Sequence, residues 1–408
     1  MELSSTTLKA SLLAAEWSKT HTPISTMRLN GRARSVLLGL HRRIRRAHEL
    51  ATEMVSGAAP GVRRSTLAAH RGKSPSGTSR FMPGNIGKYI KSNQLYQLLY
   101  TCTWGSRREP RTARLRFAVY EQLELVERTR FDDMAVRALS WLLVCSDIAP
   151  RSCSTDLDVH FLRAPFCRQL PASGATVLGP FQVNGGYATA CARAGEVVVY
   201  RVEEWFKVFV HETFHAFGLD AGAGIPDLTQ LSRSLLPVEA SHDVREAYTE
   251  TWARIINVIY CAGRKEKTFL KMCLPLLALE RTFSVIQLGK VLRHMGTNIQ
   301  CIQSEDAQRV CGYREHTNVL SYYILGGALM HNLGSFLSWC AVHAHGFIYF
   351  SPGPRRQASF GNLLTEAVHS PSLAGDLAAF SRWPGVTDGL QRSLRMTIVE
   401  CWDGGTQN

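Results

Sequence analysis

Two histidines and a glutamate lie together in one apolar stretch of the chain, "FKVFVHETFHAFGLD", residues 206–220. His211 and His215 are four residues apart, so on a helix both side chains project from one face, one turn apart. This spacing allows two imidazoles to bind one metal ion, and Glu212 beside them could accept a proton from metal-bound water. The alternative is a buried helix whose histidines only hydrogen-bond to their neighbours.

A third metal ligand must come from elsewhere in the chain. One known pattern places it ten residues after the first histidine, but that position is Ala221, and Asp220 is one place short. A later segment, residues 241–260, carries Glu246 and Glu250 four residues apart on one helical face. We predict that Glu246 binds the metal and that Glu250 holds a ligating histidine through its other ring nitrogen. The reverse assignment of the two acids is the main alternative, and a solvated helix face is another.

Two imidazoles, one carboxylate and an open position for water form a hydrolytic zinc set. We therefore expect one Zn²⁺ ion, with Glu212 acting first as general base and then as general acid in the hydrolysis of a peptide bond. An iron site with two histidines and one carboxylate is a formal alternative, but the helical H-E-x-x-H pattern with its glutamate base favours zinc.

The pair of motifs resembles a known enzyme family. "HETFH", followed about thirty residues later by "EAYTE", is similar to the gluzincin branch of the zincin metallopeptidases, and the resemblance covers roughly residues 156–260. A longer string from about residue 90 also looks similar to predicted metallopeptidases of large double-stranded DNA viruses. The resemblance implies a zinc-dependent metallopeptidase acting on peptides or proteins. The gap between His215 and Glu246 is longer than in the best-known gluzincins, which weakens inference about substrate preference.

The same resemblance implies roles for residues outside the metal set. In zincins the strand before the active helix often lies along the substrate, and here Asn184, Gly185 and Gly186 would occupy that edge strand. An ordinary hairpin turn at Asn184–Gly185 is the alternative. His316 or Tyr322 could stabilise the oxyanion of a tetrahedral intermediate as additional catalytic residues. A core position for Tyr322 is the alternative.

Positive charge is concentrated near the N-terminus. Residues 1–114 carry 20 Lys/Arg against 5 Asp/Glu, whereas the rest of the chain is nearly neutral. Residues 57–84 are rich in Gly, Pro, Ser and Arg, so we expect residues 1–84 to form a basic, largely disordered arm. Within it, residues 28–80 could bind nucleic acid or another polyanion. The alternative function is therefore a non-catalytic structural or nucleic-acid-associated protein on a zincin scaffold, for example a virion component.

The remaining patterns predict an α+β fold. Helical periodicity indicates a helical part over residues 85–155. Residues 156–260 form the predicted zincin-like metal-site core, with short β-rich segments, a small sheet and a helix over residues 203–217 that bears the H-E-x-x-H motif. Residues 261–408 are predicted to be a helical C-terminal subdomain.

Cysteine usage and hydropathy suggest a cellular setting. Eleven cysteines, an odd number without a C-x-x-C pair, favour reduced thiols in an intracellular compartment. Without a visible signal peptide we expect a protein that is not secreted, located in the host cytoplasm or the virion if it is viral. The most apolar region, residues 322–350, is broken by three histidines and an asparagine, which predicts buried helices and no membrane span.

Overall fold

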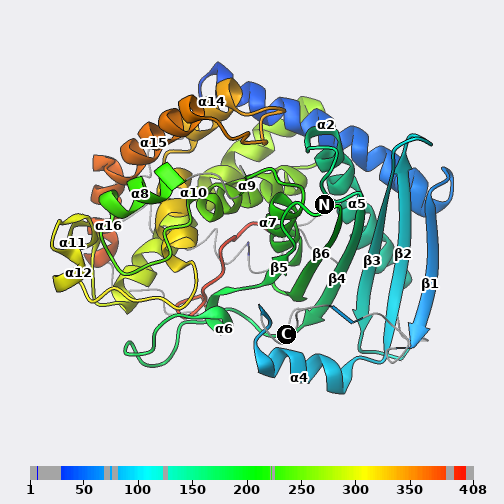
Figure 1. Cartoon of the computed structure of the whole chain (residues 1–408), viewed down its shortest axis with the longest axis horizontal. Helices are drawn as coiled ribbons and strands as arrows, with labels where there is room; N and C mark the ends of the chain where they lie inside the picture. The colour runs from blue at the N-terminus through cyan, green and yellow to red at the C-terminus, as the bar shows by residue number, and fades with distance from the viewer. Residues whose placement is uncertain are drawn as a thin grey trace. The chain divides into compact units, whose positions relative to one another are not determined.

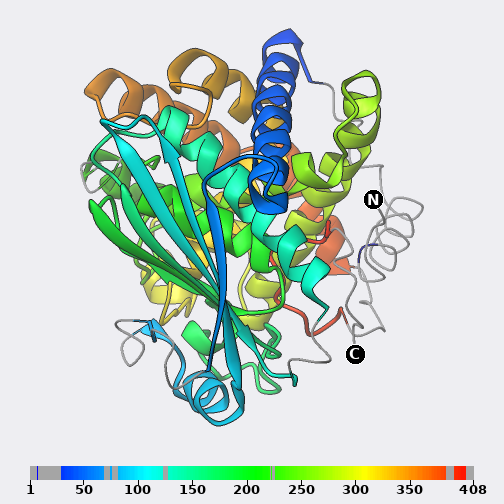
Figure 2. The ribbon, with the colours of Figure 1, turned by 90° about the vertical axis from the view of Figure 1, so that its right-hand side faces the viewer.

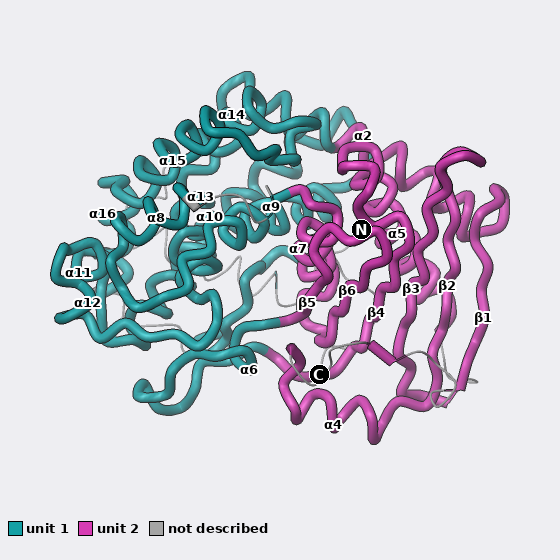
Figure 3. The backbone as a smooth tube through the Cα atoms, in the orientation of Figure 1, with its two compact units in different colours: residues 1–40, 168–184, 220–401 teal, residues 41–167, 185–219, 402–408 magenta. Residues whose placement is uncertain are grey.

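The computed structural model describes residues 7, 29–68, 74–75, 81–122, 127–220, 222, 226–382 and 390–400 (Figure 1). The chain forms two compact units, coloured separately in Figure 3. The helical unit comprises residues 1–40, 168–184 and 220–401, and the sheet unit comprises residues 41–167, 185–219 and 402–408. Each unit combines distant stretches of sequence. The predicted division of the chain at residues 84, 155 and 260 therefore does not match the two units.

The sheet unit is built on six strands in the order β1-β2-β3-β4-β6-β5. Their bounds are β1 Val62–Ala68, β2 Tyr96–Gly105, β3 Pro110–Val119, β4 Asp156–Ala164, β5 Gly186–Ala188 and β6 Ala194–Arg201. The β3–β4 and β4–β6 pairs are parallel and the other pairs are antiparallel. Figure 1 shows β1 and β5 at opposite edges of the sheet, and Figure 2 shows its twist.

Helices pack on both faces of this sheet because successive strand residues point to opposite sides. On one face, the ring of Phe161 in β4 lies 5.2 Å from that of Phe209 in α7 (Trp205–Ala216). Helix α5 (Arg128–Ile148) covers the same face, where Phe131 contacts Phe117 of β3. On the other face, Leu162 belongs to a separate apolar cluster with residues of α4 (Gly84–Asn93).

The predicted helical part over residues 85–155 contains two strands instead, so this prediction is wrong for β2 and β3. In β3 the buried residues Ala113, Leu115 and Phe117 have Arg114 and Arg116 between them. That period of two is typical of a strand, and ten residues of β3 pair with β2. The helix α5 and the short helix α4 are the parts of this range that are helical in the structure.

The predicted disordered arm over residues 1–84 is also wrong where the structure describes it. Helix α2 (Gly31–Ser56) buries Val36, Leu37 and Leu40 on one face, and β1 pairs along its whole length with β2. The apolar stripe of α2 has enough surface to bury, despite the surrounding arginines. The other parts of the arm, residues 1–6, 8–28, 69–73 and 76–80, lie outside the described residues.

The helical unit contains the long helices of the C-terminal half. Its elements are α6 Pro180–Val183, α8 Pro226–Leu235, α9 Val244–Cys261, α10 Glu266–His294, α11 Ile299–Gln303, α12 Ala307–Val310, the π-helical turn η3 Leu320–Leu325, α13 Gly326–His331, α14 Leu333–His343, α15 Pro354–Val368 and α16 Pro371–Arg382. Residues 390–400 follow as a mostly buried segment without regular structure. A six-stranded open sheet together with a mainly helical second half confirms the α+β composition.

Two disulfides join described cysteines, Cys153 with Cys191 and Cys301 with Cys311. The prediction of reduced thiols is wrong for these four residues, and the inference of a reducing intracellular setting loses its basis with them. Sequence separations of 38 and 10 residues give no spacing motif from which the pairing could be predicted. Among the described helices, none combines the length and the apolar character needed to cross a membrane.

Candidate metal centre

Helix α7 carries the histidine pair on a strongly apolar body. His211 and Glu212 are buried and His215 is partly exposed, while the aromatic and valine side chains around them fill the core. The observed bounds, Trp205–Ala216, lie within two residues of the predicted helix over residues 203–217. The amphipathic spacing was therefore sufficient to locate this helix.

One buried hydrogen bond fixes α7 against α5. The Trp141 indole Nε1–H donates to Thr213 Oγ1 at 2.7 Å, and the Thr213 hydroxyl donates to the Val210 carbonyl oxygen at 2.7 Å. The Trp141 ring also stacks on Phe214, with ring centroids 6.1 Å apart. Because Thr213 lies between the two histidines in sequence, these contacts restrict rotation of the turn that carries them.

The last turn of α7 is held by the loops that precede β4 and β6. The Cys191 backbone N–H donates to the His215 carbonyl oxygen at 3.0 Å. The Ser154 hydroxyl donates to the Ala216 carbonyl oxygen at 2.8 Å. Carbonyl groups in the last turn of a helix have no i+4 partner within the helix, so the Ser154 bond satisfies an acceptor that the helix leaves open. The Cys191 bond adds to the one that the His215 carbonyl oxygen accepts from the Gly218 N–H at 3.1 Å.

The Cys153–Cys191 disulfide packs against the glycine that ends α7. Gly218 has a φ of 63°, the left-handed conformation that commonly terminates a helix. A Cβ atom at Gly218 would lie 3.2 Å from Cys191 Sγ and 3.4 Å from Cys153 Sγ. The disulfide and the helix end are thus in direct contact, next to the histidine at position 215.

Helix α9 carries the two acidic candidates. Asp243 caps its N-terminus, where its carboxylate accepts a hydrogen bond from the Arg245 backbone N–H at 3.1 Å. Glu246 lies in the first turn, where the helix dipole stabilises a negative charge by about 0.3–1 kcal/mol. Glu250 follows one turn later, on the same face of the helix.

The structure brings three of the predicted ligands together. One ligand atom each of His211, His215 and Glu246 lies within 4.8 Å of the other two. Within the part of the chain that the structure describes, no other group of three His, Cys, Asp or Glu residues meets this criterion, and Glu250 is not a member of this one.

The two imidazoles fit a tetrahedral zinc ion. His211 Nε2 and His215 Nε2 are 3.3 Å apart. Two nitrogen ligands bound at 2.0–2.1 Å to a tetrahedral centre lie about 3.3 Å from each other, so this separation is the one that a shared ion requires. The same distance also permits one weak hydrogen bond between the rings when one Nε2 is protonated. Metal titration distinguishes these two arrangements.

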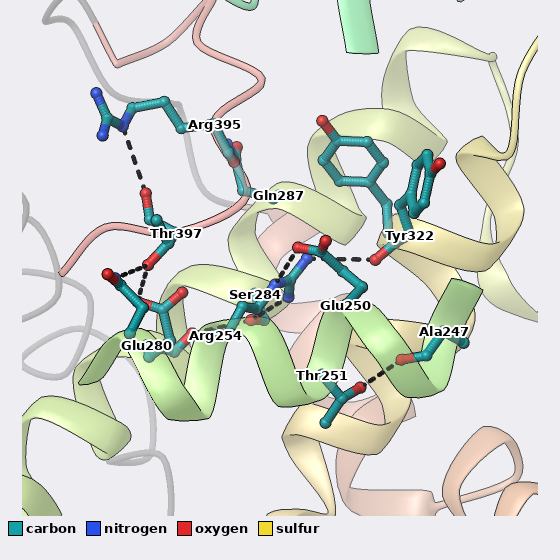
Figure 4. Close-up of polar contacts among 12 residues, drawn as sticks. Ala247, Glu250, Thr251, Arg254, Glu280, Ser284, Gln287, Tyr322, Arg395 and Thr397 are labelled. Carbon is teal, nitrogen blue, oxygen red and sulfur yellow. Dashed lines mark hydrogen bonds and ion pairs between the residues drawn. The ribbon is translucent and has the colours of Figure 1, made fainter. Parts of the chain in front are cut away.

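Glu250 is half of a buried ion pair. Arg254 Nε donates to Glu250 Oε1 at 3.0 Å, and both side chains are about 99% buried (Figure 4). The same guanidinium donates to Ser284 Oγ at 2.7 Å and to the Tyr322 carbonyl oxygen at 3.2 Å. This network keeps the Glu250 carboxylate in place. The hydrogen bond between Glu250 and a ligating histidine stays a prediction.

The glycine segment before β6 lies at one edge of the sheet. β5 is the last strand in the sheet order and pairs antiparallel with β6, with Tyr187 opposite Val198. The Tyr200 N–H donates to the Gly185 carbonyl oxygen, and the Thr189 N–H donates to that of Glu196. In an antiparallel pair, residues that bond to the neighbouring strand alternate with residues that do not, so Gly186 and Ala188 direct their N–H and C=O groups away from β6. These groups are in the orientation that an added peptide strand would need.

Gly186 also lies against the predicted general base. A Cβ atom at this position would be 3.0 Å from Glu212 Cγ and 2.5 Å from the Val198 carbonyl oxygen. The absence of a side chain therefore allows the strand to approach α7 closely. Asn184 lies just before β5, where its Oδ1 accepts a hydrogen bond from the Thr317 hydroxyl at 2.8 Å. The predicted edge strand thus begins two residues later than expected, at Gly186.

The two further catalytic candidates differ in their surroundings. His316 is exposed, and its backbone N–H donates to the Leu178 carbonyl oxygen at 2.9 Å. Tyr322 lies in η3 and packs at the margin of the apolar cluster that contains Tyr323. His316 does not belong to the group formed by the histidine pair and Glu246, and the oxyanion role of both residues stays a prediction.

Comparisons with known proteins add no information on function: no family model matches, and no curated protein or solved structure matches either. The side chains of α7, α9 and β5 are therefore the basis for any functional conclusion.

No sequence pattern identifies the residues that hold α7 in place. Trp141, Ser154 and Cys191 contact it from positions up to about 70 residues away in the chain. No local motif marks them, because each acts through a contact that exists only in the folded sheet unit. A single sequence does not show which threonine a buried tryptophan will contact, or which of eleven cysteines will lie beside α7.

Proposed function

We propose that this protein is a zinc-dependent metallopeptidase of gluzincin type. His211, His215 and Glu246 would hold one Zn²⁺, and the observation that supports this most is the 3.3 Å separation of the two Nε2 atoms with the Glu246 carboxylate nearby. Two neutral imidazoles and a carboxylate are ordinary zinc ligands, and three protein ligands leave one position for water. A bound Zn²⁺ would lower the pKa of that water and polarise the substrate carbonyl.

Glu212 is the proposed proton carrier. Its carboxylate would accept the proton of the attacking water and return it to the nitrogen of the leaving amine. Its burial and its contact with Gly186 support this role, because a peptide added along β5 would run beside the same carboxylate. The backbone groups of Gly186 and Ala188 would hold that peptide in an extended conformation.

Metal content is the first test of the proposal. We expect the purified wild type to contain about one zinc per chain by mass spectrometry, and we expect His211→Ala and Glu246→Gln to lose it. His369→Ala is the matched control, because His369 is an exposed histidine outside the group. Wild-type protein that neither contains zinc nor takes it up when supplied would show that the histidine pair only forms a hydrogen bond. Loss of zinc from Glu250→Gln but not from Glu246→Gln would invert the assignment of the two acids.

Turnover is the second test. Glu212→Gln should keep zinc and lose peptide hydrolysis by a factor on the order of 10²–10⁴, measured with a peptide library. A wild type that binds zinc but cleaves no peptide, with a Glu212→Gln variant that behaves identically, would favour the non-catalytic alternative. Nucleic-acid binding through the arginines of residues 28–80 would then be the next property to measure.

A further inference from the structure

A pocket whose chemistry differs from that of the metal centre lies in the helical unit. The basic pocket has a volume of about 440 Å³ and is lined by Lys290, Arg293 and His294 of α10 and by Arg392. Phe380 of α16 and the loop at Leu170 provide apolar walls. None of the described residues that line it is acidic. This volume falls in the range of pockets that hold small organic ligands.

Backbone carbonyl groups orient the basic side chains. Arg392 Nη2 donates to the Leu170 carbonyl oxygen at 3.0 Å, and Arg293 Nη2 donates to that of Phe380 at 2.9 Å. The Arg293 guanidinium also lies over the Phe380 ring, 4.5 Å from its centroid. Side chains held in this way lose less freedom when they bind a ligand, which favours affinity.

Lys290 lines the basic pocket and is buried. Its Nζ donates to the carbonyl oxygens of Leu390 and Ser393, which leaves one of its three hydrogens for another acceptor. Burial lowers the pKa of Lys290 to about 7. An anion beside the ammonium group would favour its protonated form, so anion binding and protonation of Lys290 support each other.

The position of these residues at the end of α10 could by itself account for some of the positive charge, but not for all of it. The C-terminus of a helix carries the equivalent of about half a negative charge, and one basic residue balances it. Here two arginines, a lysine and a histidine meet around one hollow. Positive potential therefore exceeds what the helix end requires, and an anionic ligand would offset it.

We propose that the basic pocket binds a phosphate monoester of an apolar or aromatic group. Two guanidinium groups match the oxygens of a phosphate dianion better than those of a monoanionic carboxylate. The walls at Phe380 and Leu170 would contact the organic substituent. This site is independent of the metal centre, because neither histidine of α7 lines it.

The test uses phenyl phosphate as the probe, titrated into the full-length protein at constant ionic strength and followed by calorimetry and ³¹P NMR. We expect saturable binding of phenyl phosphate, at least tenfold weaker binding of benzoate, and no binding of phenol. Arg392→Gln should weaken phenyl phosphate by about tenfold or more, as expected for loss of a charge-assisted hydrogen bond. Thermal unfolding of this variant shows whether its fold is intact.

Two control variants distinguish binding in the basic pocket from binding elsewhere on the protein. Arg309→Gln removes an exposed arginine that pairs with Asp306 outside the pocket, and it should leave affinity unchanged. His211→Ala should also leave it unchanged, which would exclude phosphate binding at the metal centre. Absence of saturation, or equal weakening by Arg392→Gln and Arg309→Gln, would overturn the proposal.

Discussion

Removal of the Cys153–Cys191 disulfide should loosen the end of α7 that carries His215. The perturbation is the double variant Cys153→Ser/Cys191→Ser. The bond closes a 38-residue loop, so its loss should lower the free energy of unfolding by about 4 kcal/mol in the chain-entropy model. The hydrogen bond from Cys191 N–H to the His215 carbonyl would no longer be held by the crosslink, and it is worth about 1 kcal/mol.

The matched control is Cys301→Ser/Cys311→Ser. That disulfide closes a 10-residue loop, for which the same model gives about 3 kcal/mol. The two variants should therefore differ little in urea unfolding, and local measurements must separate them. We expect amide hydrogen exchange over residues 211–219 to become faster only in the Cys153/Cys191 variant.

Zinc affinity is the second local measurement. Contacts that orient a ligating histidine typically change metal affinity by about 10–100-fold, so a competition titration should show a loss within this range for the Cys153/Cys191 variant alone. Unchanged exchange over residues 211–219 would refute the reasoning, whether or not the protein binds zinc. Equal losses of zinc affinity in both variants would show that general destabilisation, and not the contact at His215, is responsible.

Three further predictions follow from buried contacts. Gly186→Ala should reduce peptide hydrolysis while zinc content stays unchanged, because the added methyl displaces β5, whereas Gly195→Ala in β6 has room for its Cβ and should be active in the same assay. Burial raises the pKa of Glu280 to about 7, so its stabilising contribution is complete below about pH 4.5 and is lost as the pH rises through 7. Glu280→Gln should therefore reduce the fall in the free energy of unfolding between pH 5 and pH 8 by about 2.5 kcal/mol, and an unchanged fall in urea titrations would contradict the assignment. Arg254→Met should lower the free energy of unfolding by about 3–5 kcal/mol because it removes the guanidinium from the buried ion pair with Glu250, and the double variant with Glu250→Gln should recover part of this loss.

Local patterns predicted the elements that depend on neighbours in sequence. The helix bearing His211 and His215 was placed within two residues of its bounds, since its apolar spacing and the glycine that ends it are local properties. The strands β4 and β6 lie within the residues where short β-rich segments were predicted. β2 and β3 were misread as helical because short apolar runs fit either period until strand pairing decides between them.

Errors in the arm and the cysteines have a different origin. β1 carries Arg63 and Arg64 near its start, and it is ordered because its backbone pairs with β2 and not because its side chains are apolar. The Cys153–Cys191 pair depends on two loops that meet only after β4 and β6 pair, so neither the spacing nor the odd number of cysteines indicates it.

The sequence by itself determined which residues could bind a metal, because the spacing of His211, Glu212 and His215 fixes their relative positions on any helix. It also limited the third ligand to one of two glutamates on a later helix. Only the tertiary structure grouped Glu246 with the histidine pair, and only it placed Gly186 against Glu212. The physical reason is that contacts between residues far apart in the chain depend on the packing of whole helices and strands, which no local pattern specifies.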